Sequence, residues 1–195
     1  MQRMFRRLAN NGVGSVLVML GLAFGISGTT LLAYASDRTS QSYTLTGRVV
    51  NVADGDTFTL LVGRKRERIR MASIDAPETS HGSGRPGQNH AQASRKALAG
   101  WIAGQTFTLH CYEHDRYGRN ICDVSLADGS TVNQKMVAEG WVWANRQGRD
   151  KYLRDRTLLG LEAKAREQGL GLWERHDAVA PWVWRYQCWQ QGRCE

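Results

Sequence analysis

The sequence lacks a Cys-x-x-Cys pair, an internal repeat and any low-complexity tract. Without the Cys-x-x-Cys pair, a spacing typical of zinc ligands is missing. His110 and His114 are a weak substitute, because two residues four apart on one strand lie about 13 Å from each other. Zinc therefore stays a minor alternative. With 195 residues and no repeat, the chain has the length of one main domain.

Acidic residues are also scarce relative to basic ones. The chain holds 18 Asp and Glu against 26 Lys and Arg, a formal net charge of +8 with a pI near 9.7. This balance favours a polyanionic partner such as nucleic acid, or an anionic membrane surface. Residues 1–35 contain three arginines and no acid, so the remainder keeps a net charge of +5 and the basic bias belongs to it.

The acid-free N-terminal segment has the pattern of a targeting sequence. A basic start precedes a largely apolar run over residues 12–35, which ends in the small-residue pattern Ala33, Tyr34, Ala35. We interpret residues 1–35 as a signal peptide cleaved after Ala35, or as an uncleaved membrane anchor, since the run reaches the roughly 20 apolar residues that span a bilayer. The protein is therefore expected to be periplasmic or secreted, or anchored to the inner membrane by residues 12–35.

Cysteine is rare, and all four residues lie in the part that we expect to be exported: Cys111, Cys122, Cys188 and Cys194. An even number of cysteines in an oxidising compartment favours disulfides. Cys111 and Cys122 flank a predicted turn over residues 115–119, so two antiparallel strands on either side would bring them face to face. Cys188 would then pair with Cys194, while the other two connectivities stay open.

The hydrophobic pattern predicts a small barrel. Residues 43–62 have the composition of a hairpin around Asp54-Gly55, a third strand is predicted over 66–75, and two more strands over 105–126. Helices are predicted over 90–104, over 130–140 with Ser130 or Thr131 as the cap, and from Asp150 to near Gly169. The order favours an α+β, mainly β fold: a five-stranded OB-type Greek-key barrel with about three packed helices.

The sequence after the N-terminal segment divides into a linker, a domain and a tail. Residues 36–41 are predicted as a polar linker, residues 42–175 as the OB-fold domain, and residues 176–195 as a tail rich in Trp and Cys. The tail is too short for a core of its own, so we expect it to pack back on the domain. The loop over residues 80–89 is dense in Gly, Ser and Pro.

Carboxylates are concentrated at two predicted strand ends. Asp54 and Asp56 flank Gly55 at one connection, and Asp75 and Glu78 end the basic strand that precedes them. Clustered carboxylates supply hard oxygen ligands, which select Ca²⁺, Mg²⁺ or Mn²⁺. Taken singly, each pair has a structural reading, as a turn around Asp54-Gly55 or as a capping box that begins at Asp75.

Two arginines accompany these acids. Arg70 lies five residues before Asp75, and Arg119 closes the "DRYGR" turn. Because a guanidinium is always charged and presents a planar fork, two of them near a metal would neutralise a phosphodiester. An arginine on a strand edge is otherwise usually just solvated.

The motifs "DGDT", "RMASIDAPE", "DRYGR" and "GLGLW" occur in this order, and as a set the chain closely resembles the staphylococcal nuclease family over roughly 43–173. The resemblance implies that Asp56 and Asp75 supply carboxylate ligands to a catalytic Ca²⁺ and that Ala76 supplies its backbone carbonyl. It further implies that Glu78 orients or deprotonates the attacking water.

The resemblance also assigns the phosphate and nucleotide contacts. Arg70 and Arg119 match the arginines that bind the scissile phosphate, Tyr117 matches a position near the bound nucleotide, and Arg116 lies where a basic residue is common. The expected substrate is DNA and/or RNA, cleaved by a calcium-dependent phosphodiesterase of endonuclease type. The tyrosines that contact the base in the family's prototype have no confident match here, so base preference stays open.

Two alternatives remain beside the nuclease. One is a non-catalytic OB-fold module that only binds nucleic acid through its basic surface. The other is a disulfide-stapled envelope protein whose charge serves the membrane surface, which leaves the set of acids and arginines unexplained. No protein partner is predicted, and a monomer is expected.

Overall fold

The computed structural model describes residues 41–194. The predicted signal or anchor over residues 1–35 and nearly all of the predicted linker lie outside the described residues. Within residues 41–194, no helix is both long enough and apolar enough to cross a membrane.

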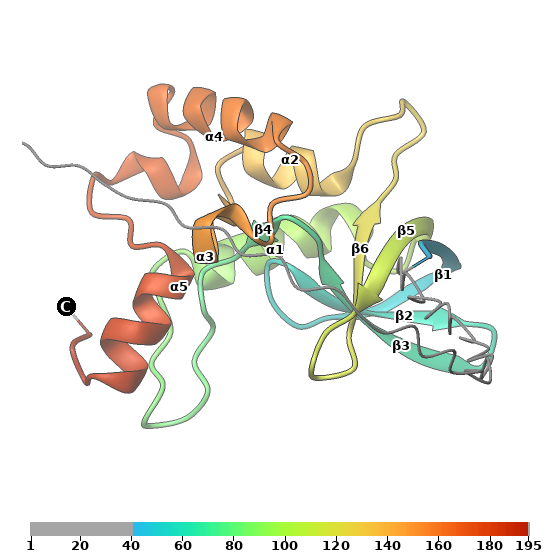
Figure 1. The fold of residues 1–195 in the computed structure, drawn as a ribbon, viewed down its shortest axis with the longest axis horizontal. Helices are drawn as coiled ribbons and strands as arrows, with labels where there is room; N and C mark the ends of the chain where they lie inside the picture. The colour runs from blue at the N-terminus through green and yellow to red at the C-terminus, as the bar shows by residue number, and fades with distance from the viewer. Residues whose placement is uncertain (1–40, 195) are drawn as a thin grey trace, which may run out of the picture. The chain divides into compact units, whose positions relative to one another are not determined.

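Five strands close into a barrel, which confirms the predicted OB-type architecture (Figure 1). The strands follow the order β1-β2-β3-β6-β5 around the barrel, and β5 closes it by pairing with β1. All neighbours are antiparallel except β3 and β6, which run parallel. Their bounds are Tyr43–Val52 for β1, Thr57–Val62 for β2, Lys65–Met71 for β3, Thr106–His114 for β5 and Asn120–Val124 for β6.

The barrel interior is filled by the apolar side chains that the strand pattern turns inward. Phe58 and Leu60 of β2, Ile69 of β3 and Leu109 of β5 are at most 1% exposed. Neighbouring strands twist and tilt to close the barrel, so these inward residues meet in one core. On β3 the buried residues are Ile69 and Met71, and the charged side chains of the strand are partly or fully exposed.

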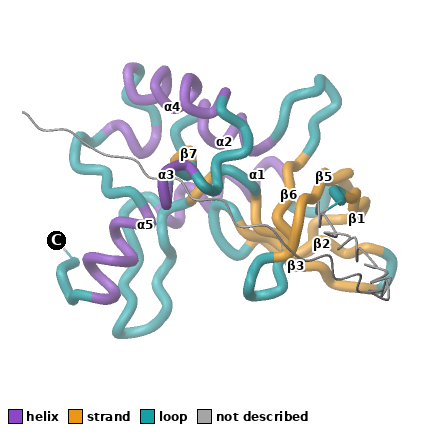
Figure 2. The backbone as a smooth tube through the Cα atoms, viewed as in Figure 1, coloured by secondary structure: helices purple, strands orange, loops and turns teal. Residues whose placement is uncertain are grey.

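Three helices of two or more turns accompany the barrel: the first two contact its strands, and the third packs on the second one rather than on the barrel (Figure 2). They are α1 (Ala91–Ile102), α2 (Val132–Ala138) and α4 (Thr157–Glu167). Thr131 caps α2: its hydroxyl accepts the Gln134 N–H, and the Gln134 side chain accepts the Thr131 N–H, a complete capping box.

The predicted start of the last helix at Asp150 is wrong. Asp150 ends the short irregular helix α3 (Gln147–Asp150) with a φ of 62°, and α4 begins only at Thr157. The carboxylate of Asp155 accepts the Thr157 N–H at 2.9 Å, which stops the helix from extending backwards. The predicted end is confirmed, because α4 closes at Glu167 and Gly169 follows with a φ of 63°.

The third predicted strand is interrupted where the acids begin. β3 stops at Met71, and a two-residue strand β4 (Ile74–Asp75) follows, paired with β7 (Trp143–Ala144) outside the barrel. Ser73 between them has a φ of 63°, and its hydroxyl accepts the N–H groups of Arg154 and Asp155. These bonds offset the cost of a left-handed backbone at a residue other than glycine.

The C-terminal tail packs back on the domain, as predicted. After η1 (Gly171–Glu174), the helical pieces α5 (Pro181–Trp184) and η2 (Arg185–Gln190) form what we call the C-terminal segment, which lies beside the loop of residues 80–89 (Figure 1). The indole N–H groups of Trp184 and Trp189 both donate to the carbonyl of Pro86 in this loop, at 3.1 and 2.9 Å.

Both disulfides of the predicted pairing are present, Cys111–Cys122 across β5 and β6 and Cys188–Cys194 in the tail.

Replacing Cys111 and Cys122 together by Ala should lower the free energy of unfolding by about 3 kcal/mol, because the disulfide closes a loop between residues that are 11 apart and so restricts the unfolded chain. Urea unfolding followed by tryptophan fluorescence measures the loss. The matched control, Ala at 188 and 194, opens a shorter loop and should cost less; an equal loss in both variants would contradict the prediction.

Candidate active site

The connection between β1 and β2 brings the first pair of acids together. Gly55 has no room for a side chain, since a Cβ there would lie 2.0 Å from the Ser94 hydroxyl oxygen of α1 and 2.9 Å from the Ala76 Cβ. This close approach folds the loop so that the Asp54 carboxylate accepts the Asp56 N–H at 3.0 Å. The Asp56 side chain is thereby turned inward, where it is 7% exposed.

Arg70 joins the two strand ends that carry the acids. The Cα of Arg70 pairs with that of Thr57, and the Met71 N–H donates to the Asp56 carbonyl at 2.8 Å, so β3 ends beside Asp56. From there the Arg70 guanidinium forms an ion pair with Asp56 through Nη1 and with Asp75 through Nη2, the latter at 2.7 Å. Asp56 and Asp75 are therefore held on opposite arms of one buried arginine.

Strand pairing and a backbone N–H bond to distant parts of the chain fix the second acidic stretch. Pairing of β4 with β7 places Asp75 opposite Trp143, and the Ala76 N–H donates to the second carboxylate oxygen of Asp56 at 2.6 Å. Trp143 is 4% exposed and packs edge-on against Trp173 at 5.1 Å between ring centroids. Trp143 is thus part of a small core behind the site and presents no face for stacking a base.

Glu78 is oriented from two sides. Its backbone N–H donates to the Gln88 side-chain oxygen at 3.0 Å, while the Gln88 amide donates to the Val179 carbonyl at 2.7 Å. The Glu78 carboxylate forms an ion pair with Nη1 of Arg185 from the C-terminal segment. The structure therefore brings Glu78 to the same cluster as Asp75 through a residue of the tail.

Arg119 lies at the edge of this cluster. Its Nε donates to Asp115 at 2.7 Å, and its Nη1 reaches the Thr57 hydroxyl at 3.4 Å. The Thr57 hydroxyl in turn donates to Asp56 at 3.0 Å, so one side chain separates Arg119 from the predicted metal ligand. Tyr117, 59% exposed, stands beside this arginine with its ring centroid 5.6 Å from the Arg119 Cζ.

Arg116 contacts the same ring. Its Cζ is 4.8 Å from the centroid of Tyr117, and its Nη2 donates to the phenol oxygen at 2.7 Å. The two predicted nucleotide-contact residues thus form one exposed pair in the β5–β6 turn, next to Arg119. An exposed aromatic face flanked by guanidiniums is suited to a nucleotide.

The electrostatics show more negative charge than the arginines neutralise. Four carboxylates, those of Asp54, Asp56, Asp75 and Glu78, share two guanidiniums, those of Arg70 and Arg185. Burial and then the charge of Asp56 raise the pKa of Asp54 to about 7. Burial also raises the pKa of Glu78, an effect that the ion pair with Arg185 partly offsets. Although burial acts to raise the pKa of Asp56, Arg70 and hydrogen bonds lower it overall.

This surplus of acid fits a hard cation. In the described part of the chain no three His, Cys, Asp or Glu side chains converge into a complete metal cage. The available donors are two carboxylates, those of Asp56 and Asp75, and the carbonyl of Ala76, which are oxygen ligands suited to Ca²⁺. All four cysteines are in disulfides, which leaves none to bind zinc.

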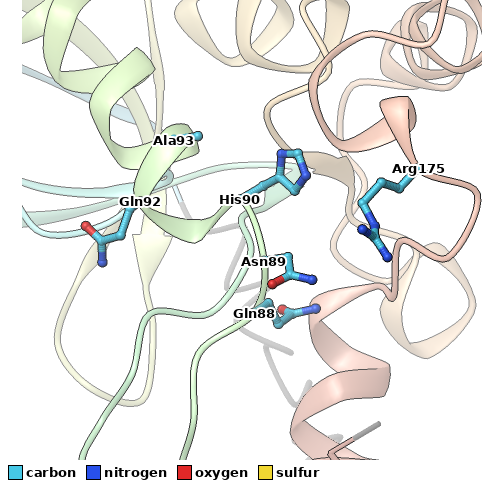
Figure 3. Close-up of a pocket in the computed structure, with 6 residues that line it drawn as sticks. All are labelled: Gln88, Asn89, His90, Gln92, Ala93 and Arg175. Carbon is cyan, nitrogen blue, oxygen red and sulfur yellow. The ribbon is translucent and has the colours of Figure 1, made fainter.

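A shallow hollow opens next to the cluster, between the start of α1 and the segment that precedes α5. Figure 3 shows its lining residues: Gln88, Asn89, His90, Gln92, Ala93 and Arg175. None of the predicted catalytic, metal or nucleotide-binding residues lines it. Only Gln88 links the hollow to the cluster, through its bond to the Glu78 backbone.

Residues 68–175 match the family model described as "Staphylococcal nuclease homologue", which spans more than half of the chain. The chain belongs to the staphylococcal nuclease family. The match begins within β3 and ends just after η1, so it includes Arg70, Asp75, Glu78 and Arg119 and leaves the C-terminal segment outside. Family membership supports a nuclease, a hydrolase that acts on nucleic acid.

Similar proteins point the same way. A protein of Escherichia coli O157:H7 named "Uncharacterized endonuclease" is 40% identical over 141 residues, which cover 72% of this chain and 85% of that protein. A protein of Shigella flexneri named "Micrococcal nuclease" is 37% identical over 148 residues, with 71% and 79% covered. An "Uncharacterized endonuclease" of Haemophilus influenzae is 35% identical, with 73% and 74% covered.

Sequence reasoning missed three residues that this nuclease-family site uses. The Asp115 carboxylate accepts both the backbone N–H and the Nε–H of Arg119, and an acid four residues before an arginine in the same turn was a sign in the sequence. Gln88 lies in a Gly- and Pro-rich loop and gave no sign. Arg185 is more than a hundred residues from Asp75, and only the folded tail brings the two together.

The raised pKa of Asp54 predicts how stability depends on pH. In the unfolded chain this carboxyl ionises near pH 4, whereas in the folded protein it stays protonated until about pH 7, so the folded state becomes less stable as the pH rises across that range. Asp54→Asn keeps the oxygen that accepts the Asp56 N–H and cannot ionise. In EDTA at pH 8 it should raise the free energy of unfolding by about 1–3 kcal/mol.

Urea titrations of both proteins from pH 4 to pH 8 measure this effect. The gain should shrink as the pH falls towards 4, where the wild-type carboxyl is protonated in the folded state and increasingly protonated in the unfolded chain. A gain that is the same at every pH would show that burial of the Asp54 charge is not its origin. Asp177→Asn, at an exposed acid of the tail, serves as the control.

Proposed function

We propose that the protein is a calcium-dependent nuclease that hydrolyses phosphodiester bonds of DNA and/or RNA outside the cytoplasm. One observation carries this proposal: Arg70 grips Asp56 and Asp75, and Arg185 grips Asp75 and Glu78, so the acids expected to bind metal and water form one connected cluster. Acids that only stabilise a turn would not be expected to converge on shared arginines and leave a net negative charge in the cluster.

Asp56, Asp75 and the carbonyl of Ala76 are the groups that would hold Ca²⁺. When bound, the ion would supply positive charge that draws the phosphate oxygens and the attacking water. Arg70 and Arg119 bind the non-bridging oxygens and stabilise the charge that grows on them in the transition state. Arg116 and Tyr117, at the exposed turn, contact the adjoining nucleotide.

Glu78 accepts the proton of the attacking water on a carboxylate oxygen. Its burial raises its pKa, which makes the ionised form a better base than a fully exposed glutamate. Because the Gln88 side chain fixes its backbone and Arg185 its carboxylate, Glu78 is held in one orientation before the substrate arrives.

The remaining assignments follow the sequence. Residues 1–35 act as a signal peptide or membrane anchor, residues 36–41 as a linker, residues 42–175 as the nuclease domain and residues 176–195 as its tail. Two disulfides are compatible with an oxidising compartment, which supports export to the periplasm or beyond. The enzyme acts as a monomer, without a protein partner.

Incubation of the protein with plasmid DNA and with RNA, in Ca²⁺ or in EDTA, tests this function. We expect fragments in Ca²⁺ and none in EDTA. Asp75→Asn should abolish most cleavage and weaken Ca²⁺ binding in a calorimetric titration, while Asp177→Asn, at an exposed pair with Arg175, should change neither. Cleavage in EDTA, or cleavage restored only by Zn²⁺, would reject the metal assignment. Tight binding of nucleic acid without fragments would support the non-catalytic OB-fold module instead.

Glu78→Gln tests the general base separately from the metal. The amide keeps the size of the side chain and can still accept a hydrogen bond, but it cannot take up the proton, so kcat should fall by about 100-fold or more. Affinity for Ca²⁺ should change little, because the proposed ligands are intact. Loss of Ca²⁺ binding with near-normal single-turnover cleavage at saturating Ca²⁺ would make Glu78 a ligand, and this role would be rejected.

A further inference from the structure

The C-terminal segment places a second arginine, Arg185, on the carboxylate cluster beside Arg70. Nη2 of Arg185 lies 2.8 Å from one carboxylate oxygen of Asp75, and Nη1 lies 3.3 Å from the other oxygen and also pairs with Glu78. Nη2 further donates to the Gln147 side-chain oxygen at 3.3 Å. This single side chain therefore touches both the proposed metal ligand and the proposed base.

Contacts that do not involve the cluster hold the segment in place. Trp184 and Trp189 donate to the Pro86 carbonyl, and the Cys188–Cys194 disulfide closes the turn after them. The Gln88 amide donates to the Val179 carbonyl just before α5, and the same Gln88 side chain accepts the Glu78 N–H. The loop that carries Glu78 and the segment that carries Arg185 are thus fastened to each other.

The arrangement leaves Asp75 no uncommitted oxygen. One oxygen faces Nη2 of Arg70 and Nη1 of Arg185, and the other faces Nη2 of Arg185. Asp75 is only 2% exposed, so water cannot replace these donors, whereas Arg185 is 28% exposed and lies on the solvent side. Both guanidiniums would repel a cation at Asp75, so its binding favours displacement of one of them, and the exposed Arg185 is easier to move than the buried Arg70.

We propose that Arg185 is a positioning residue of the nuclease centre: it holds Glu78 in its working orientation from the C-terminal segment, and it occupies Asp75 until a divalent cation displaces it. The inference rests on the proposed function. In the metal-free protein Arg185 neutralises Asp75 and Glu78 together. After displacement from Asp75 it keeps its bond to Glu78, because the tryptophan anchors retain the segment.

The variant Arg185→Gln separates the two roles, since they predict changes of opposite sign. Calorimetric titration with Ca²⁺ and no substrate should show binding about tenfold tighter than wild type, because a competing positive charge is gone. At saturating Ca²⁺, kcat on plasmid DNA should nevertheless fall about tenfold, because the Glu78 carboxylate is no longer held. Arg193→Gln is the matched control: it lies in the same tail and its side chain bonds Gln191, away from the carboxylate cluster, so both quantities should stay at wild-type values.

Arg185→Lys keeps the charge and loses the two-armed contact, so Ca²⁺ affinity should return towards wild type while kcat recovers only in part. Thermal unfolding in EDTA shows whether Arg185→Gln is folded. If it is not, Arg185→Lys replaces it as the test variant. Unchanged affinity and kcat in Arg185→Gln would reduce the contact to a surface ion pair and overturn the inference. Weaker Ca²⁺ binding with lower kcat would make Arg185 a structural residue, and tighter binding with unchanged kcat would leave it a competitor without a positioning role.

The experiment distinguishes this inference from the proposed function. If wild type binds Ca²⁺ and cleaves while Arg185→Gln matches it in both respects, only the inference fails. If neither protein binds Ca²⁺, the proposed metal and the inference fail together. If only Arg185→Gln binds Ca²⁺, competition by Arg185 is supported directly.

Discussion

The buried ion pairs of Arg70 with Asp56 and Asp75 are the contacts on which the rest of the site depends. They join the β1–β2 connection to the exit of β3, two places that are twenty residues apart in the chain. Removing one member of such a network leaves an uncompensated buried charge and typically costs about 3–5 kcal/mol. The barrel register serves this contact, because pairing of Thr57 with Arg70 sets the arginine beside the loop that carries Asp56.

The acids crowd together at a cost to stability. Burial, and then the charge of Asp56, raise the pKa of Asp54 to about 7, and Glu78 is buried with the partly exposed Arg185 as its ion-pair partner. A strongly basic protein could neutralise these groups fully, yet it surrounds four carboxylates with two guanidiniums. Strain of this kind is typical of functional sites, where the missing positive charge arrives with a ligand.

The C-terminal segment completes one side of the carboxylate cluster from outside the residues that match the family model. The family match ends at residue 175, and the segment beyond it carries the second disulfide, the tryptophans that grip Pro86 and the arginine that reaches Asp75 and Glu78. A short segment without a core of its own is held by a disulfide and a few directed hydrogen bonds.

Local patterns in the sequence predicted the barrel and the three helices, narrowed the cap of α2 to Ser130 or Thr131 and favoured the disulfide pairing that the structure shows, because each depends on residues close together in the chain or on alternation along one strand. The same patterns misplaced the start of α4, where the Asp155 carboxylate competes for the helix N–H groups, and ran β3 through Ser73, whose left-handed backbone is stabilised by the distant Arg154 and Asp155. The motifs named Asp56, Arg70 and Asp75 as members of one site.

The tertiary structure alone decided that Trp143 is buried and that Arg185 meets Asp75 and Glu78. The last contact spans more than a hundred residues, and no local pattern encodes it. It arises from the packing of the tail on the loop of residues 80–89, which is an outcome of the whole fold.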